Sequence, residues 1–138
     1  MTRYPTLEKI LGKQIISMSR GRVVVDENLA GIVPLLQDRN IRVTTPDKGK
    51  TDSDIMRDLI GNRIFITNNA KNFLDSAIET ETWIISTEKV RKKLLDKDLA
   101  ELISKTIQDL KLFSKRITGG MLITLNLTGK PLIKILED

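Results

Sequence analysis

Three short polar segments, each next to an apolar run, carry the side chains of this sequence that could do chemistry. Asp26 and Glu27 follow the run Val23–Val25, the segment 51–54 reads TDSD, and the segment 67–69 reads TNN. Carboxylate and amide oxygens are the ligands that Mg²⁺ and Mn²⁺ prefer in proteins. A divalent metal held by such groups polarises a phosphoryl oxygen and supplies hydroxide at neutral pH. The pattern therefore suits hydrolysis of a phosphodiester bond.

The sequence contains neither histidine nor cysteine, which excludes most other catalytic chemistry. Without these residues the chain has no disulfide, no thiolate or imidazole metal ligand, and no Ser–His or Cys–His catalytic pair. An enzyme built on this chain must therefore work with carboxylates, lysine, hydroxyl groups or a bound metal. The lack of cysteine also fits a reducing compartment.

The overall composition is that of one small globular domain, with 138 residues, 40% of them hydrophobic and 30% charged. The net charge of +5 fits a nucleic-acid partner and equally fits simple solubility. One Trp, one Tyr and three Phe are too few for a base-stacking surface. The start of the sequence lacks the apolar core of a signal peptide, and no apolar run approaches the ~20 residues of a membrane span. We expect a cytoplasmic protein without a membrane partner.

Strands and helices alternate through the first two thirds of the chain. We predict strands at 23–25, 41–44, 63–67 and 83–86, because these runs are rich in β-branched or other apolar residues. Helical patterns lie within 1–20, after Asn28, at 51–60 and at 70–78. In the second of these helices Asn28 is the expected cap, and Pro34 is expected in the first turn. This alternation with short connections predicts an α/β fold with parallel strands joined by right-handed crossovers.

The last third of the chain changes character. Residues 88–95 and 97–116 are highly charged and predict helices, and two further strands are expected at 121–127 and 131–136. The short connection 128–130 predicts a hairpin, which forms either an antiparallel edge of the sheet or a pairing surface for a second subunit in a homodimer. No linker divides the chain, so we expect one domain over 1–138, with a core at 22–87 followed by the helical segment and the hairpin.

The polar segments should gather at one edge of the sheet, because ligands of open parallel sheets bind outside the carboxyl ends of the strands. The expected rim consists of Asp26 with Glu27 nearby, Asp52 or Asp54, Asn69, Asn72 and Asp75. Each residue also has a purely structural interpretation, since acidic residues and asparagines cap helices and form turns. The placement of all of them at one edge is what favours a metal site over these individual explanations.

The same segments resemble the three motifs of PIN and PIN-like domains, including the VapC-type toxins, and are closest to the compact branch of small bacterial and archaeal proteins. In that family a strand ends in Asp, as VVVDEN does at 23–28. A helix opens with a D-x-x-I pattern, here at 52–55, and a strand closes with T-x-N-x-x-D-F, here TNNAKNF at 67–73. The likeness covers residues 22–87.

The resemblance implies a three-layer α/β/α fold with a central, mainly parallel sheet and an Mg²⁺- or Mn²⁺-dependent endoribonuclease acting on single-stranded RNA. It assigns Asp26 and Asp52 as metal ligands, with Asn69 orienting the centre and Thr67 supporting it. Asp54 is the second choice for the acid at the helix start. The protein would be the toxin of a toxin–antitoxin pair, with an antitoxin as partner, or an RNA-processing factor.

One position departs from the family pattern. The acid that commonly precedes the phenylalanine of the third motif is Asn72 here. An amide can still offer a carbonyl oxygen to a metal, but it carries no charge and is a poor base. We therefore place Asn72 with the catalytic residues Asp26, Asp52 and Asn69, and expect Asp75, or Glu79 one turn later, to supply the missing charge.

The same departure supports an alternative, a catalytically degenerate PIN-like module that binds RNA or protein. The charged segment 88–116 could then dock a protein partner. A receiver-like domain is a third interpretation of Asp26 and Glu27 after a strand. It requires a phosphoacceptor Asp at a later strand end, which neither Thr67-Asn68 nor Ser86-Thr87 supplies.

Basic residues near the motifs could steer the RNA backbone through non-specific phosphate contacts. The candidates are Lys48, Lys50, Arg57 and Lys71. For any single one of these residues, an ordinary solvated surface position is the simpler explanation.

Overall fold

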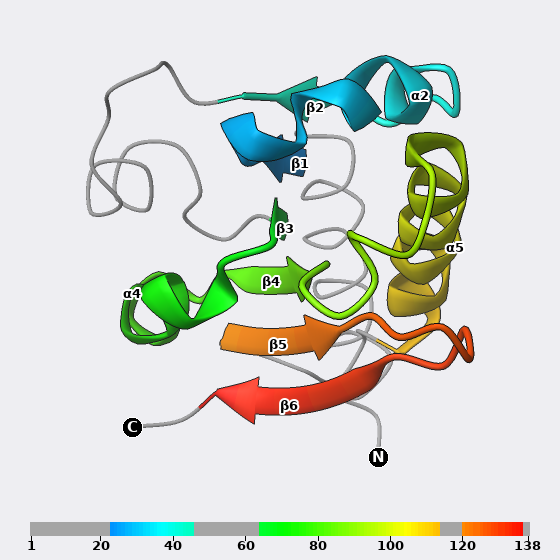
Figure 1. The fold of residues 1–138 in the computed structure, drawn as a ribbon. Coiled ribbons are helices and arrows are strands. Elements are labelled where there is room, and N and C mark those ends of the chain that lie inside the picture. The colour runs from blue at the N-terminus through cyan, green and yellow to red at the C-terminus, as the bar shows by residue number, and fades with distance from the viewer. Residues whose placement is uncertain (1–22, 46–63, 114–119, 137–138) are drawn as a thin grey trace, which may run out of the picture.

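The computed structural model describes residues 23–45, 64–113 and 120–136, which form a six-stranded sheet with helices against it (Figure 1). The strand order is β2-β1-β3-β4-β5-β6. Strands β1 to β5 run parallel, and β6 pairs with β5 in the antiparallel direction. The strands are β1 (Val23–Val25), β2 (Val43–Thr44), β3 (Ile64–Thr67), β4 (Trp83–Ser86), β5 (Gly120–Thr124) and β6 (Leu132–Leu136).

The central strands are apolar on successive residues because both faces of the sheet are covered. Every residue of β1, β3 and β4 is buried. Since side chains alternate between the two faces of a strand, neighbours such as Val24 and Val25 join different clusters. The predicted α/β fold with a mostly parallel sheet is confirmed.

The described residues contain five helical segments: η1 (Glu27–Ile32), α2 (Val33–Gln37), η3 (Ala70–Phe73), α4 (Leu74–Thr80) and α5 (Asp96–Phe113). One cluster joins Val23 and Val25 of the sheet to η1, α2 and α5. The other joins Val24 and Phe65 to η3 and α4, where the rings of Phe65 and Phe73 meet edge to face at 4.7 Å between centroids.

The first helical segment differs from the sequence prediction in its cap. The chain turns into the 3-10 helix η1 directly after β1, and the side chain of Asp26, not that of Asn28, accepts the capping hydrogen bond, from the Asn28 N–H at 3.2 Å. The α-helix α2 begins only at Val33, which leaves Pro34 in its first turn as expected.

The expected helix over 88–95 is wrong, because this segment forms consecutive turns. The N–H groups of Val90 and Arg91 both donate to the Thr87 carbonyl, and the ladder does not continue as a helix. Leu95 is 75% exposed, so the segment lacks the continuous buried stripe that would hold a helix against the sheet. An ion pair of 3.0 Å between Arg91 and Asp96 joins the turns to the start of α5.

The predicted C-terminal hairpin is confirmed at the edge of the sheet, with a shorter first strand. β5 ends at Thr124 because the Asn126 side chain bends the chain, accepting from the Thr128 N–H and donating to the Lys130 carbonyl. The predicted helices within 1–20 and 51–60, and the end of the one at 97–116, lie outside the described residues.

Gly120 offers a direct test of how tightly β5 packs on α4. A Cβ atom at this position would lie 2.7 Å from the backbone carbonyl oxygen of Ala77, which cannot move without shifting α4. We expect Gly120→Ala to lower the free energy of unfolding by about 1–3 kcal/mol in a urea titration. Gly31→Ala is the comparison variant, because its new Cβ would meet the end of a side chain, the Asp96 carboxylate, and no backbone atom. Equal stability of the two variants would contradict the packing described.

Candidate functional site

The strand order places Asp26 and Thr67 at the position where open α/β sheets bind ligands. From β1 the chain moves outward to β2 and then returns to the other side of β1 to form β3. The order of the strands therefore reverses between β1 and β3, and the crevice outside the carboxyl ends of two such strands is the usual ligand site. Asp26 directly follows β1, and Thr67 is the last residue of β3. The two residues thus flank this reversal point.

A hydrogen bond joins these two side chains. The Thr67 hydroxyl donates to Oδ2 of Asp26 at 2.8 Å, although the residues lie 41 positions apart in the sequence. The sheet ladder holds them at the same level, because the Asp26 N–H donates to the Ile66 carbonyl at 3.0 Å. Thr67 is completely buried and Asp26 is half-buried. The carboxylate is therefore fixed at the protein surface by a group that is itself immobilised in the core.

Two backbone N–H groups complete the network around Asp26. The Asn69 N–H donates to the Thr67 hydroxyl oxygen at 3.0 Å, so the hydroxyl proton is directed to Asp26. The Asn28 N–H donates to the other carboxylate oxygen, Oδ1, at 3.2 Å. From the described residues, each carboxylate oxygen accepts one hydrogen bond, which leaves lone-pair capacity for a ligand.

The predicted rim residues that follow β3 differ in their exposure and in whether they are linked to Asp26. Asn69 is half-buried and linked to Asp26 through Thr67, which brings together three of the expected residues. Asn72 and Asp75 lie further along η3 and α4, and both are exposed. Glu27 and Glu79 are also exposed.

No three acidic side chains among the described residues are grouped closely enough to hold a metal. Among the described rim residues, Asp26 is the carboxylate that hydrogen bonds hold in place, and the backbone of Asn69 is joined to it through Thr67. Lys71 is an exposed residue of η3. The other predicted site residues lie outside the described residues: Lys48, Lys50, Asp52, Asp54 and Arg57.

Sequence reasoning missed a row of hydroxyl groups that continues the rim beyond Thr67. Thr67, Ser86 and Thr124 are partners in the sheet register, so these hydroxyls lie side by side at the ends of β3, β4 and β5. Thr87 follows in the chain, and its N–H donates to the Thr67 carbonyl at 3.0 Å. Its completely buried hydroxyl has no hydrogen-bond partner in the described structure. The signal in the sequence was a hydroxyl residue at the end of every one of these apolar runs.

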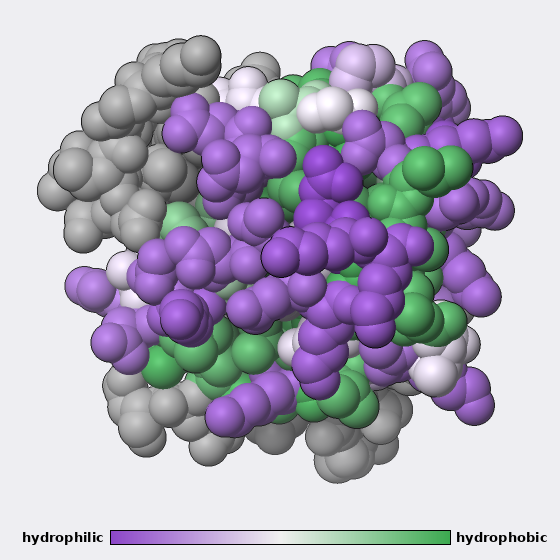
Figure 2. Space-filling model, in the orientation of Figure 1, coloured by the Kyte–Doolittle hydropathy of each residue, from purple (hydrophilic) through white to green (hydrophobic). Residues whose placement is uncertain are grey.

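The surface of this face matches the polar character of the rim. Figure 2 shows hydrophilic residues gathered in a band across the middle of the view, where Figure 1 draws β3 and β4. Hydrophobic surface lies to either side of the band.

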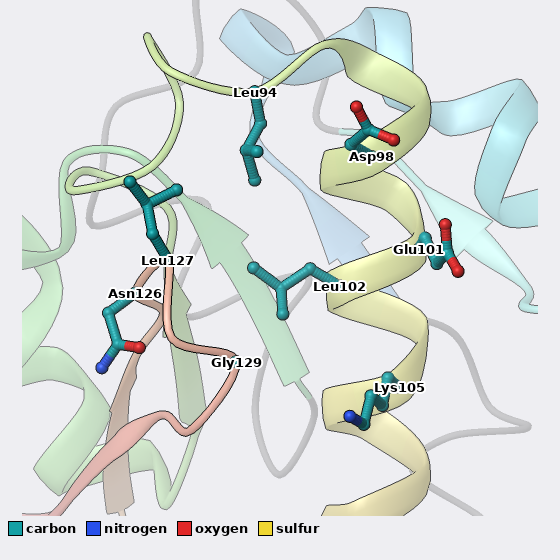
Figure 3. Close-up of a pocket in the computed structure, with 8 residues that line it drawn as sticks. All are labelled: Leu94, Asp98, Glu101, Leu102, Lys105, Asn126, Leu127 and Gly129. Atoms are coloured by element: carbon teal, nitrogen blue, oxygen red, sulfur yellow. The ribbon is translucent and has the colours of Figure 1, made fainter.

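A separate groove of about 250 Å³ lies between α5 and the turn that precedes β6 (Figure 3). The side chains of Leu94, Leu102 and Leu127 converge on it. Asp98, Glu101 and Lys105 of α5 form its charged border. The groove contains none of the predicted site residues.

Comparisons with known proteins identify no relative of this chain. No protein-family model matches it, and neither a curated protein nor a solved structure does so. The resemblance to PIN-like domains stays a prediction that rests on the motif residues. Within the described residues, no helix combines the length and the apolar character needed to cross a membrane.

The Thr67 hydroxyl gives a test of the network that requires no assumption about activity. Thr67→Val keeps the shape of the side chain but leaves the Asn69 N–H and Oδ2 of Asp26 without this partner. We expect a loss of about 1–3 kcal/mol in the free energy of unfolding, measured by urea titration. Thr67→Ser retains the hydroxyl and should therefore retain the contribution of these hydrogen bonds to the free energy of unfolding. A valine variant as stable as the wild-type protein would contradict the hydrogen bonding described.

Proposed function

We propose that the protein is a metal-dependent endoribonuclease of the PIN-like type, with a three-layer α/β/α fold, that hydrolyses phosphodiester bonds of single-stranded RNA. The observation that carries the proposal is the 2.8 Å hydrogen bond from Thr67 to Asp26. It joins the acid of the first motif to the threonine of the third. Two motifs chosen from the sequence for their chemistry therefore meet at the reversal point of the sheet.

Two chemical features of Asp26 support a role in metal binding. Its carboxylate is partly exposed, and both oxygens are oriented by hydrogen bonds while keeping lone pairs for a cation. Metal ligands in proteins are commonly held in this way by groups behind them. A single carboxylate is not a complete metal site, so a second acid is needed, and Asp52 or Asp54 would supply it. Asp75 is the remaining candidate.

The residues of this chain have separate roles in the proposal. Asp26 holds Mg²⁺ or Mn²⁺ together with Asp52, and Asn69 offers an amide oxygen beside them. Thr67 is a positioning residue that fixes the Asp26 carboxylate. Lys71 contacts RNA phosphates, joined by Lys48, Lys50 and Arg57. The metal, when bound, stabilises charge on the phosphoryl group and lowers the pKa of a water nucleophile. As a toxin of this type, the protein would have an antitoxin as its partner.

A second candidate function is a degenerate PIN-like module that binds RNA or protein without cleaving it. The observation in its favour is Asn72, an exposed amide at the position where the family commonly has an acid. The described residues contain no group of three acids that would compensate for this missing charge. Under this alternative, the Asp26 network serves only to hold the edge of the sheet together.

RNA cleavage separates the two candidates. With a labelled pool of single-stranded RNA, we expect cleavage that requires Mg²⁺ or Mn²⁺ and stops with EDTA. Asp26→Asn should reduce the rate on the order of 100-fold or more, since a catalytic metal is worth several kcal/mol of transition-state stabilisation. Thr67→Val should lose about 10–100-fold, as expected for a residue that orients a ligand.

Asp38→Asn is the matched control, because Asp38 is an exposed acid at the end of α2 and lies in none of the motifs. It should cleave at the wild-type rate. If the folded wild-type protein cleaves with neither metal, the nuclease proposal is wrong, and metal-independent binding of the same RNA would favour the degenerate module. If Asp26→Asn cleaves at the wild-type rate, Asp26 is not a ligand of the catalytic metal.

Asn72 gives an independent test that should increase activity. Asn72→Asp restores the carboxylate of the family motif, and an added charged ligand strengthens the binding of a hard cation. We expect the metal concentration for half-maximal cleavage to fall on the order of tenfold. Gln37→Glu, which adds the same charge at an exposed position of α2, should leave that concentration unchanged. An equal effect of both variants would mean that net charge, not a metal ligand at position 72, is responsible.

A further inference from the structure

The last strand of the sheet exposes an unusual concentration of large apolar side chains. Five large hydrophobic residues of the described structure are exposed, and four of them belong to the hairpin that contains β6. On β6 itself, Leu132 is 59% exposed, Ile133 is 42% exposed and Ile135 is 41% exposed. In Figure 2, hydrophobic surface reaches solvent low in the view, where Figure 1 draws β5 and β6.

The position of β6 makes this exposure significant. β6 is the edge strand next to β5, so within residues 23–45, 64–113 and 120–136 no strand pairs with its outer N–H and C=O groups. Proteins protect such edges by shortening the strand, bulging it or placing charges on it. The opposite edge, β2, follows this rule, because it contains only two residues. β6 has five residues in unbroken register with β5, and Lys134 is its single charge.

We propose that β6 pairs with β6 of a second copy of this chain, antiparallel across a two-fold axis. This pairing extends the six-stranded sheet of each protomer into one continuous sheet. It satisfies the open backbone groups of both edge strands and covers the exposed isoleucines with their own counterparts. A closed, two-fold arrangement also removes the edge that would otherwise recruit further chains.

The charge on β6 restricts the register of this pair. If Lys134 lay on the two-fold axis, two ammonium groups would face one another directly, which is unfavourable for a cross-strand pair. Registers with Ile133 or Ile135 on the axis avoid this repulsion and place two isoleucines opposite each other. The interface is that of two short strands, so the dimer is a weak one that depends on protein concentration.

The dimer does not rest on the proposed nuclease function. Asp26 and β6 are separated by β3, β4 and β5 in the sheet, so pairing at the β6 edge leaves the candidate site uncovered. A protein that does not cleave RNA could still form the dimer, and a monomeric protein could still bind a metal at the proposed site. The two proposals can therefore fail independently.

Sedimentation equilibrium over a wide concentration range tests the pairing. We expect the average mass of the full chain to rise with concentration from 15.6 kDa toward twice that value. The double variant Ile133→Lys/Ile135→Lys should stay monomeric, with an unchanged circular dichroism spectrum to show that it folds. Leu95→Lys is the matched control, since Leu95 is the exposed large hydrophobic residue outside the hairpin in the described structure, and this variant should associate like the wild type.

Cysteine cross-linking gives the register directly, because the natural chain contains no cysteine. Under mild oxidation, either Ile133→Cys or Ile135→Cys should form a disulfide-linked dimer in high yield, whereas Leu95→Cys should not. A wild-type protein that stays monomeric at all concentrations would overturn the proposal. Association that persists in the double lysine variant would also overturn it.

Discussion

The structure of the candidate site depends on the parallel pairing of β1 with β3. This pairing brings Val24 opposite Phe65 and Val25 opposite Ile66, so the next residues of the two strands, Asp26 and Thr67, reach the edge of the sheet together. Because both strands are completely buried, their register is fixed by packing on both faces. The hydrogen bond between the Thr67 hydroxyl and Asp26 follows from that register. The polar site is thus positioned by the most apolar part of the molecule.

Asp26 also shows that a structural and a chemical role can be combined in one side chain. Its Oδ1 caps the helix η1 through the Asn28 N–H, and its Oδ2 accepts the Thr67 hydroxyl. The capping interpretation of the sequence is therefore correct without excluding a metal ligand, because each oxygen keeps lone-pair capacity. A carboxylate that caps a helix is held in one orientation by the backbone. Such prior orientation is what a metal ligand needs, since little conformational entropy remains to be lost on binding.

The sequence predicted the parts of the fold that depend on local pattern. The runs predicted as strands at 23–25, 63–67 and 83–86 could be identified because each contains three consecutive apolar residues, and the turn residues 128–130 indicated the hairpin. The helix predicted at 88–95 was wrong because a charged composition does not show whether a segment has a buried face to hold it. The bond between Thr67 and Asp26 could only be anticipated as proximity at one edge, since it depends on strand order. The row formed by Ser86 and Thr124 was missed because it requires the register of three strands.

A metal centre at Asp26 can be tested by titrating Mn²⁺ into the folded protein and measuring the paramagnetic broadening of its backbone amide signals. We expect the amides of Asp26, Asn28, Thr67 and Asn69 to broaden first as Mn²⁺ is added. The amide signals of β6, which is separated from β1 by three strands, should remain sharp. The same titration of Asp26→Asn should lose this pattern. Broadening centred elsewhere, or none at Mn²⁺ concentrations that saturate ordinary metal sites, would contradict a metal centre at the ends of β1 and β3.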